Sequence, residues 1–249
     1  MSIIDIDTLS FRYPDGTAGL ERISLKIEKG ALVVITGPNG SGKTTLLKHL
    51  NGLLLPQSGS VRIDGVAVAH DLRRVRRLVG MIFQDADSQI VGETVAADVA
   101  FGPENLNLPA AEVAARVAAS LAAVGMTALA DQPPQALSGG EKRRLAIAGI
   151  LAMHPRVVVF DEPFAGLDYP GTRQVLGEML RLHQAGHTLL VATHDLEKIV
   201  YHADRLIVMS AGRIVRDGPP CGIIGEIERF GVRAPCASRL GLEAPSWLS

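Results

Sequence analysis

The sequence predicts an α/β fold with a mostly parallel central sheet, and three observations support this prediction. An unbroken apolar run at residues 32–35 leads into a glycine-rich loop, as buried parallel strands do. In the C-terminal half, short apolar segments alternate with segments of helical length, the pattern of a parallel sheet covered by helices. Residues 23–27 alternate apolar and polar side chains, which indicates a half-buried, antiparallel β part near the N-terminus.

Two local signals place further elements in the first half of the chain. A helix at about 44–51 follows the glycine-rich loop and is expected to end at Gly52. Residues 61–69 are predicted to form a hairpin, because Asp64-Gly65 is a strong two-residue turn signal.

From about residue 87 to 155 the chain becomes rich in alanine, and an inserted helical subdomain is predicted there. Four apolar side chains recur at helical spacing and are expected to pack in its core: Val113, Val117, Leu121 and Val124. Later elements are a helix from about 138 to 153, strands at 157–160, 188–193 and 205–209, and helices at 171–184 and 195–203. The main domain is expected to span 1–219, and residues 220–249, which match no motif, are assigned to a C-terminal extension.

Composition limits the class of protein. With 249 residues, 47% hydrophobic and 20% charged, the chain is long and apolar enough for a globular fold. A formal net charge of −1 does not indicate the basic face of a nucleic-acid-binding protein, so no nucleic-acid partner is expected. No apolar run approaches the ~20 residues of a membrane-spanning helix, so any membrane role is expected to depend on a partner. Cys221 and Cys236 lack metal-ligand spacing and are expected to be free thiols.

The glycine-rich loop has the composition of a phosphate-binding loop. It consists of Gly37, Pro38, Asn39, Gly40, Ser41, Gly42, Lys43 and Thr44, and Thr45 follows it. Its glycines let successive backbone N–H groups turn toward phosphates at a helix N-terminus. Lys43 is expected to reach the β- and γ-phosphates of a nucleotide, and the Thr44 hydroxyl to ligate Mg²⁺.

An acidic pair, Asp161-Glu162, follows the apolar strand predicted at 157–160. Ligands of parallel sheets bind at the carboxyl ends of the strands, so Asp161 is expected to hold Mg²⁺. In other phosphate-loop enzymes a carboxylate at this position usually holds the ion through a water molecule. Glu162 is then placed to polarise a water in line with the γ-phosphate, as a general base. The alternative is a pair of exposed loop acids that cap the next segment.

The tetrapeptide Leu137-Ser138-Gly139-Gly140 stands between these two motifs. In this order the three motifs resemble those of ATP-binding cassette (ABC) ATPases, over roughly residues 3–218. The resemblance implies an ATPase that uses ATP and Mg²⁺ and works as a dimer. Ser138, Gly139 and Gly140 of one subunit would then close over ATP held by the other subunit. A hydroxyl and backbone N–H groups at a helix N-terminus favour such an anion.

The same resemblance implies roles for four single residues. Gln84 matches the glutamine that contacts Mg²⁺ and water, and His194 the histidine that contacts the γ-phosphate and orients the attacking water. Tyr13 matches the aromatic residue that stacks on adenine, and Asp168 matches a residue of the loop that crosses the dimer interface in that family. Without the family pattern, His194 would be a cap of the following helix and Tyr13 an ordinary strand residue.

A narrower resemblance, to the ATPases of energy-coupling-factor (ECF) importers, rests on residues 83–89, 94–95, 98–106 and 141–149. Ala86 departs from that pattern, which usually has proline at this position. The resemblance implies uptake of a vitamin or of cobalt or nickel ions. It also implies three partners: a transmembrane scaffold protein, a small substrate-binding membrane protein, and a second ATPase subunit that is identical or a close paralogue. The chain is then expected at the cytoplasmic face of the membrane, as a peripheral protein.

Other readings of the sequence stay open. One is the ATPase of another ABC importer, for amino acids or osmolytes, or of a lipoprotein-release system. Another is a soluble ABC protein that acts on ribosomes or DNA, although such proteins usually carry two cassettes, long coiled coils, zinc insertions or basic linkers. A generic phosphate-loop nucleotide binder would leave the Leu-Ser-Gly-Gly motif and His194 unexplained.

Overall fold

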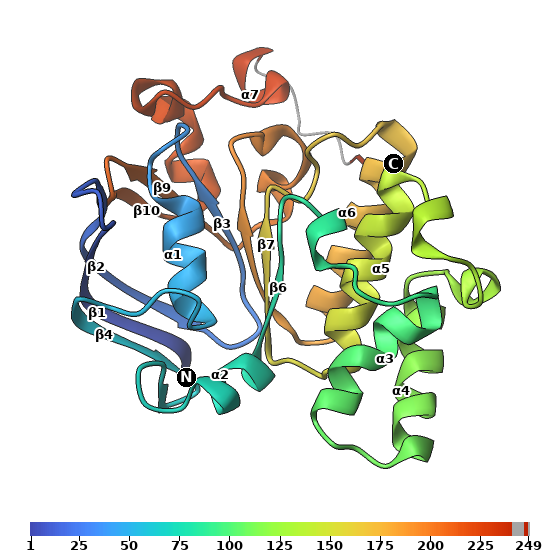
Figure 1. Cartoon of the computed structure of the whole chain (residues 1–249). Coiled ribbons are helices and arrows are strands. Elements are labelled where there is room, and N and C mark those ends of the chain that lie inside the picture. The colour runs from blue at the N-terminus through green and yellow to red at the C-terminus, as the bar shows by residue number, and fades with distance from the viewer. Residues whose placement is uncertain (241–246, 249) are drawn as a thin grey trace.

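The computed structural model describes residues 1–240 and 247–248, and it confirms the predicted α/β fold (Figure 1). In these residues the central sheet has six strands in the order β10-β9-β3-β8-β7-β6. They are β3 (Leu32–Thr36), β6 (Val79–Ile82), β7 (Val157–Asp161), β8 (Thr188–Ala192), β9 (Arg205–Ser210) and β10 (Arg213–Gly218). Neighbours are parallel except β10, which runs antiparallel to β9. The four strands of this sheet predicted between 32 and 209 are confirmed.

A second, antiparallel sheet is formed by the N-terminal part of the chain. In the described residues its order is β2-β1-β4-β5, with β1 (Ser2–Arg12), β2 (Ala18–Glu28), β4 (Ser58–Ile63) and β5 (Val66–Ala67). The predicted hairpin is confirmed, because β4 and β5 pair across Asp64 and Gly65. Their φ angles of 48° and 77° are both positive, as a two-residue type I′ turn requires.

The helices cover both faces of the central sheet. They are α1 (Lys43–Leu50), α2 (Leu72–Leu78), α3 (Val95–Asn105), α4 (Ala110–Ala123), α5 (Gly139–Ala152), α6 (Tyr169–Gln184) and α7 (Cys236–Leu240). Short 3-10 helices are η1 (Asp87–Gln89), η2 (Thr127–Leu129), η3 (Pro134–Ala136), η4 (Leu196–Lys198), η5 (Val200–His202), η6 (Pro220–Gly222) and η7 (Ile224–Phe230). Helix α1 lies between the two sheets, whereas α3, α4 and α5 pack against one another beside the central sheet (Figure 1).

The helix predicted at 195–203 is wrong. The chain forms η4 and η5 there instead, separated by Ile199, whose φ of −127° and ψ of −27° interrupt the helical backbone. The Asp195 side chain accepts a hydrogen bond from the backbone N–H of Glu197, which favours a tight turn over an α-helix. Because Leu196, Ile199 and Val200 are all buried, core packing rather than helical periodicity sets the path of this segment.

The central sheet separates two hydrophobic cores. On β3, Leu32 and Val34 belong to the core that contains α5 and α6 residues, such as Leu145. Val33 and Ile35 belong to the core that contains α1 and the antiparallel sheet. This alternation is the period of two expected of a strand buried on both faces. Because β3 is packed on both faces, its end, and therefore the start of the glycine-rich loop, is held between two packed layers.

His49 on α1 is fully buried and gives the fold a dependence on pH. Its Nδ1 donates to the Thr45 carbonyl oxygen at 2.8 Å, and burial lowers its pKa. The imidazole is therefore kept neutral in the folded chain, and its contribution to stability is lost as pH falls below the unfolded pKa of about 6.5. Between about pH 7.5 and 5.5, we expect the wild-type chain to lose more unfolding free energy, measured in urea, than His49→Gln. Equal losses would contradict this account.

Candidate nucleotide site

The phosphate loop joins β3 to α1 and needs glycine at two places. Gly37 has a φ of 151°, and a Cβ there would clash with the carbonyl oxygen of Met209. Gly42, just before α1, has a φ of 101°, and a Cβ there would lie 2.8 Å from the Gly19 carbonyl oxygen. The loop is therefore wrapped closely against neighbouring backbone, with the N-terminus of α1 at its end.

Lys43 lies over this loop and is held by it. Its Nζ donates to the carbonyl oxygens of Gly37 at 2.7 Å and Pro38 at 3.1 Å. Burial lowers the pKa of Lys43, and the nearby carboxylates of Glu162 and Asp161 oppose that shift. The ammonium group thus lies at the loop, close enough to the carboxylates of Glu162 and Asp161 for their charges to affect its pKa.

Asp161 is the last residue of β7, and its side chain is hydrogen-bonded to the end of the phosphate loop. The Thr44 hydroxyl donates to its Oδ1 at 3.0 Å, across 117 positions of sequence. Asp161 is buried, and burial raises its pKa. A hydroxyl and a carboxylate in contact, beside a lysine, are hard oxygen donors of the kind that Mg²⁺ prefers. The residues present therefore fit the predicted magnesium site.

Glu162 is the most firmly oriented acid of the site. Its Oε2 accepts the Thr193 hydroxyl at 2.9 Å. Its Oε1 accepts the His194 backbone N–H at 3.1 Å and lies 2.9 Å from His194 Nδ1, which donates in the tautomer that this contact requires. Glu162 itself has a φ of 49°, a left-handed backbone that is rare for glutamate. Strain of this kind is concentrated at functional sites.

Most of the residues predicted for the phosphate site surround one cavity of about 490 Å³, but Gly37 and Asp161 are not among its lining residues. Of the predicted site residues, it is lined by Tyr13, Asn39, Gly40, Ser41, Gly42, Lys43, Thr44, Thr45, Gln84, Glu162 and His194. Tyr13 is held at its edge, because its hydroxyl lies 2.7 Å from the Thr45 hydroxyl and its ring packs edge-on against Phe11. The structure therefore brings together predicted site residues from five separate parts of the sequence.

The Leu-Ser-Gly-Gly motif lies elsewhere in the same chain. Ser138, Gly139 and Gly140 line a different cavity of about 450 Å³, together with Asp168. Ser138 caps α5 in a reciprocal capping box with Glu141, and Asp168 caps α6 by accepting the Gly171 N–H at 2.9 Å. The two cavities share no lining residue in the described part of the chain. One subunit alone thus does not bring the motif to its own phosphate loop.

Thr193 is a site residue that the sequence reasoning missed. Its hydroxyl is buried and donates to Glu162, and it also accepts the Asp195 backbone N–H at 3.1 Å. The available signal was its position, directly before His194 at the carboxyl end of β8. A threonine is common at such a position, so only its hydrogen bond to Glu162, directly after β7, gives it a role.

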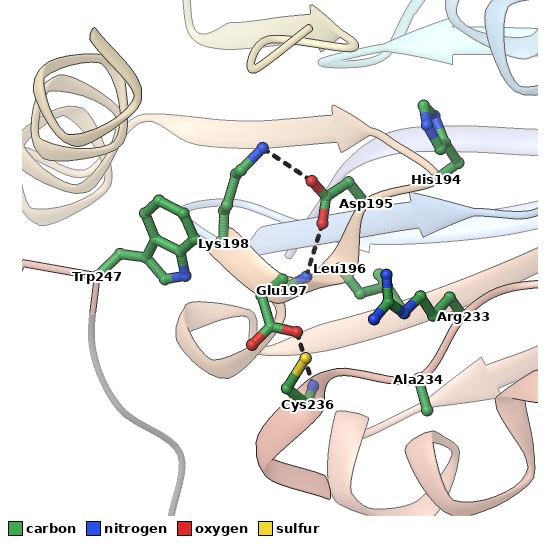
Figure 2. A pocket seen from close by; sticks show the side chains of 9 residues that line it. All are labelled: His194, Asp195, Leu196, Glu197, Lys198, Arg233, Ala234, Cys236 and Trp247. Carbon is green, nitrogen blue, oxygen red and sulfur yellow. Dashed lines mark hydrogen bonds and ion pairs between the residues drawn. The ribbon is translucent and has the colours of Figure 1, made fainter. Parts of the chain in front are cut away.

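The C-terminal segment contacts the loop that follows His194 and forms a further pocket of about 440 Å³ (Figure 2). The Cys236 backbone N–H donates to Glu197 Oε2 at 2.7 Å, and Lys198 Nζ lies 2.8 Å from Asp195 and 5.7 Å from the centre of the Trp247 ring. Cys221 and Cys236 are free thiols, as predicted, and both are exposed. Of the predicted extension at 220–249, residues 241–246 and 249 lie outside the described part.

The loop at the end of β3, with an acidic pair at the end of β7, defines a phosphate-loop nucleoside triphosphatase. Residues 20–165 match the ABC transporter family, and the chain belongs to this family as one of its ATPases. Among known proteins, the energy-coupling factor transporter ATP-binding protein EcfA of Methanocaldococcus jannaschii is 47% identical over 246 residues. The match covers 96% of this chain and 88% of that protein.

Two solved structures share the fold. CbiO1 from Clostridium perfringens, part of the ABC transporter complex CbiONQ, gives a TM-score of 0.84 at 35% identity and covers 96% of this chain and 98% of that one. The dimeric structure of the ATP-binding cassette MJ0796, in a post-hydrolysis state bound to ADP and Pi, gives a TM-score of 0.78 at 27% identity. The match covers 87% of this chain and 98% of that one. In residues 1–240 and 247–248 of the present chain, no helix is long and apolar enough to cross a membrane.

Proposed function

We propose that this chain is the ATP-hydrolysing subunit of an ECF-type importer, and that two such subunits close around two ATP molecules to drive uptake of a vitamin or a transition-metal ion. The observation that carries this proposal is that the phosphate loop and the Leu-Ser-Gly-Gly motif line two separate cavities of one chain. The likeness to EcfA and CbiO1 supports the importer type, and the dimeric cassette with ADP and Pi supports the pairing.

In the proposed reaction, the phosphates of ATP lie in the loop 37–44 and the adenine stacks on Tyr13. Lys43 stabilises the negative charge that develops on the transferred phosphoryl group. Glu162, oriented by Thr193 and His194, takes the proton of the attacking water. Mg²⁺, when held by Thr44, Asp161 and Gln84, supplies further neutralisation of phosphate charge.

We assign the catalytic unit to residues 1–219, with the helical part at about 87–155 inserted in it, and residues 220–249 to an extension. In the dimer, Ser138, Gly139 and Gly140 of each subunit close on the nucleotide of the other, and Asp168 lies in the loop that crosses between them. The partner ATPase is an identical chain or a close paralogue.

An apolar groove between α3 and α4 supports docking of a membrane scaffold. It has a volume of about 910 Å³, and most of its lining is alanine, valine and leucine, including Ala100, Ala114 and Leu121. Small side chains on a helical surface let another helix approach closely. We propose that a coupling helix of the transmembrane scaffold occupies this groove at the cytoplasmic face of the membrane.

Purification of the tagged chain from the membranes of its native cells, followed by mass spectrometry, tests this function. We expect a polytopic scaffold and a small substrate-binding membrane protein to accompany the wild-type chain, and Ala114→Arg, inside the groove, to lose both. Ala115→Arg is the matched control, because Ala115 is exposed on α4 but does not line the groove. Recovery of ribosomes, DNA or only soluble partners would contradict the importer and favour a soluble ABC protein.

A further inference from the structure

Arg143, on α5, is a buried arginine bound almost entirely to backbone carbonyl groups. Its side chain comes from the helix that begins at the Leu-Ser-Gly-Gly motif, and only 4% of the residue is exposed. Nη1 donates to the Phe83 carbonyl oxygen at 2.9 Å, and Nη2 donates to that of Gln84 at 2.8 Å. Nη2 also reaches the Ala165 carbonyl oxygen at 3.5 Å.

These contacts join three segments that belong to different parts of the proposed ATP site. Gln84 lines the nucleotide cavity of its own chain. Ala165 begins the stretch that leads to Asp168, at the second cavity. Helix α5 carries Ser138 as its N-cap. One guanidinium group therefore connects Gln84, which is expected to contact Mg²⁺ and water, with α5 and the segment 165–168, which are both expected to contact the partner's ATP.

The backbone before Gln84 is fixed from the other side by Gln89. Its Oε1 accepts the Phe83 N–H at 2.8 Å, and its Nε2 donates to the Met81 carbonyl oxygen at 2.9 Å. Together, Gln89 and Arg143 hold the N–H and the carbonyl of Phe83. The position of Gln84 at the cavity thus depends on where α5 places the Arg143 side chain.

Stability alone does not explain an arginine at this position. Burial lowers the pKa of Arg143, and Nε has no hydrogen-bond partner among the described residues. A buried charge with incomplete partners is less stabilising than a well-packed neutral side chain. What arginine provides is a planar fork that spans two consecutive carbonyl groups, which lysine cannot reproduce.

We propose that Arg143 is a positioning residue that couples closure of the Leu-Ser-Gly-Gly motif on ATP to the placement of Gln84. This inference rests on the proposed function, and it deepens it. When α5 moves with the partner's nucleotide, Arg143 carries the carbonyls of Phe83 and Gln84 with it. Gln84 then reaches its working position only in the closed dimer, so each subunit links its own hydrolysis to the ATP of its partner.

The test compares Arg143→Lys and Arg143→Gln with Arg116→Lys. Arg116 is a matched control, because its Nη1 also donates to a backbone carbonyl oxygen of α5, that of Ala152 at 3.1 Å, and Arg116 does not line the nucleotide cavity. We expect kcat for ATP to fall at least about tenfold in both Arg143 variants, with ATP affinity unchanged within about twofold. The Mg²⁺ concentration for half-maximal turnover should rise in the same variants. Arg116→Lys should keep the wild-type values of kcat and of Mg²⁺ activation.

Gln89→Leu provides a second approach that leaves α5 untouched, and it should lower kcat in the same way. Thermal melting checks that each variant is folded. If Arg143 and Arg116 variants lose equal activity, in proportion to their melting temperatures, or if ATP affinity falls as much as kcat, the coupling role is overturned and the ATPase remains. A wild-type chain that fails to hydrolyse ATP would overturn the proposed function, and the coupling with it.

Discussion

Glu162→Gln is expected to lower ATP turnover by about 10²- to 10⁴-fold while ATP still binds, the range in which a general base contributes. The substitution keeps the shape of the side chain, and its amide oxygen can still accept the hydrogen bond of the His194 backbone. It removes the basic carboxylate, and with it a negative charge beside the proposed position of the γ-phosphate. Closed dimers should therefore form with ATP and persist, because the step that reopens them is blocked.

Phosphate release and size-exclusion chromatography, each with ATP and Mg²⁺, measure the two parts of this prediction. Glu197→Gln is the control, since Glu197 also lies near His194 but bonds the Cys236 backbone and does not line the nucleotide cavity. It should hydrolyse ATP within about twofold of wild type. Wild-type turnover in Glu162→Gln would remove Glu162 as the base, whatever the dimer does.

Elements whose signals are consecutive in the sequence could be predicted. The strand, loop and helix at 32–50 are confirmed, because an apolar run, a glycine-rich turn and a helix N-terminus follow one another directly. The turn at Asp64-Gly65 is confirmed for the same reason. Residues 195–203 have an apolar spacing that suits a helix, yet packing of Ile199 bends the chain into two 3-10 turns. A local pattern carries no information about that packing.

Contacts between distant residues could not be predicted in the same way. Glu162 and His194 are 32 residues apart and meet because β7 and β8 are adjacent parallel strands, with Asp161 opposite Ala192. The sequence predicts both strands but not their order in the sheet. Arg143 lies in the segment 141–149 that supports the ECF resemblance, but its contacts were not predicted. Its two shortest hydrogen bonds are to backbone carbonyl groups about 60 positions away, and a sequence pattern does not indicate such contacts.

Ser138→Arg is expected to abolish turnover while ATP binding to the isolated subunit is retained. The new side chain would fill the cavity that is expected to receive the partner's nucleotide, but it lies outside the cavity of its own phosphate loop. Loss of the Ser138 cap of α5 costs about 1 kcal/mol, so the variant should fold. Lys43→Ala is also expected to be inactive, but for the opposite reason, because it weakens ATP binding in its own chain.

Mixing these two inactive variants decides whether the ATP site is shared between subunits. In a mixed dimer, the phosphate loop of the Ser138→Arg chain meets the intact Leu-Ser-Gly-Gly motif of the Lys43→Ala chain, so one complete site is restored. Random pairing gives about half mixed dimers, and single-turnover hydrolysis should recover to about a quarter of the wild-type amplitude. If each chain used its own motif, no pairing could restore a site. Mixed dimers that form but hydrolyse nothing would therefore place the whole reaction within one chain, and the two cavities of a subunit would have to be joined by a movement of α5.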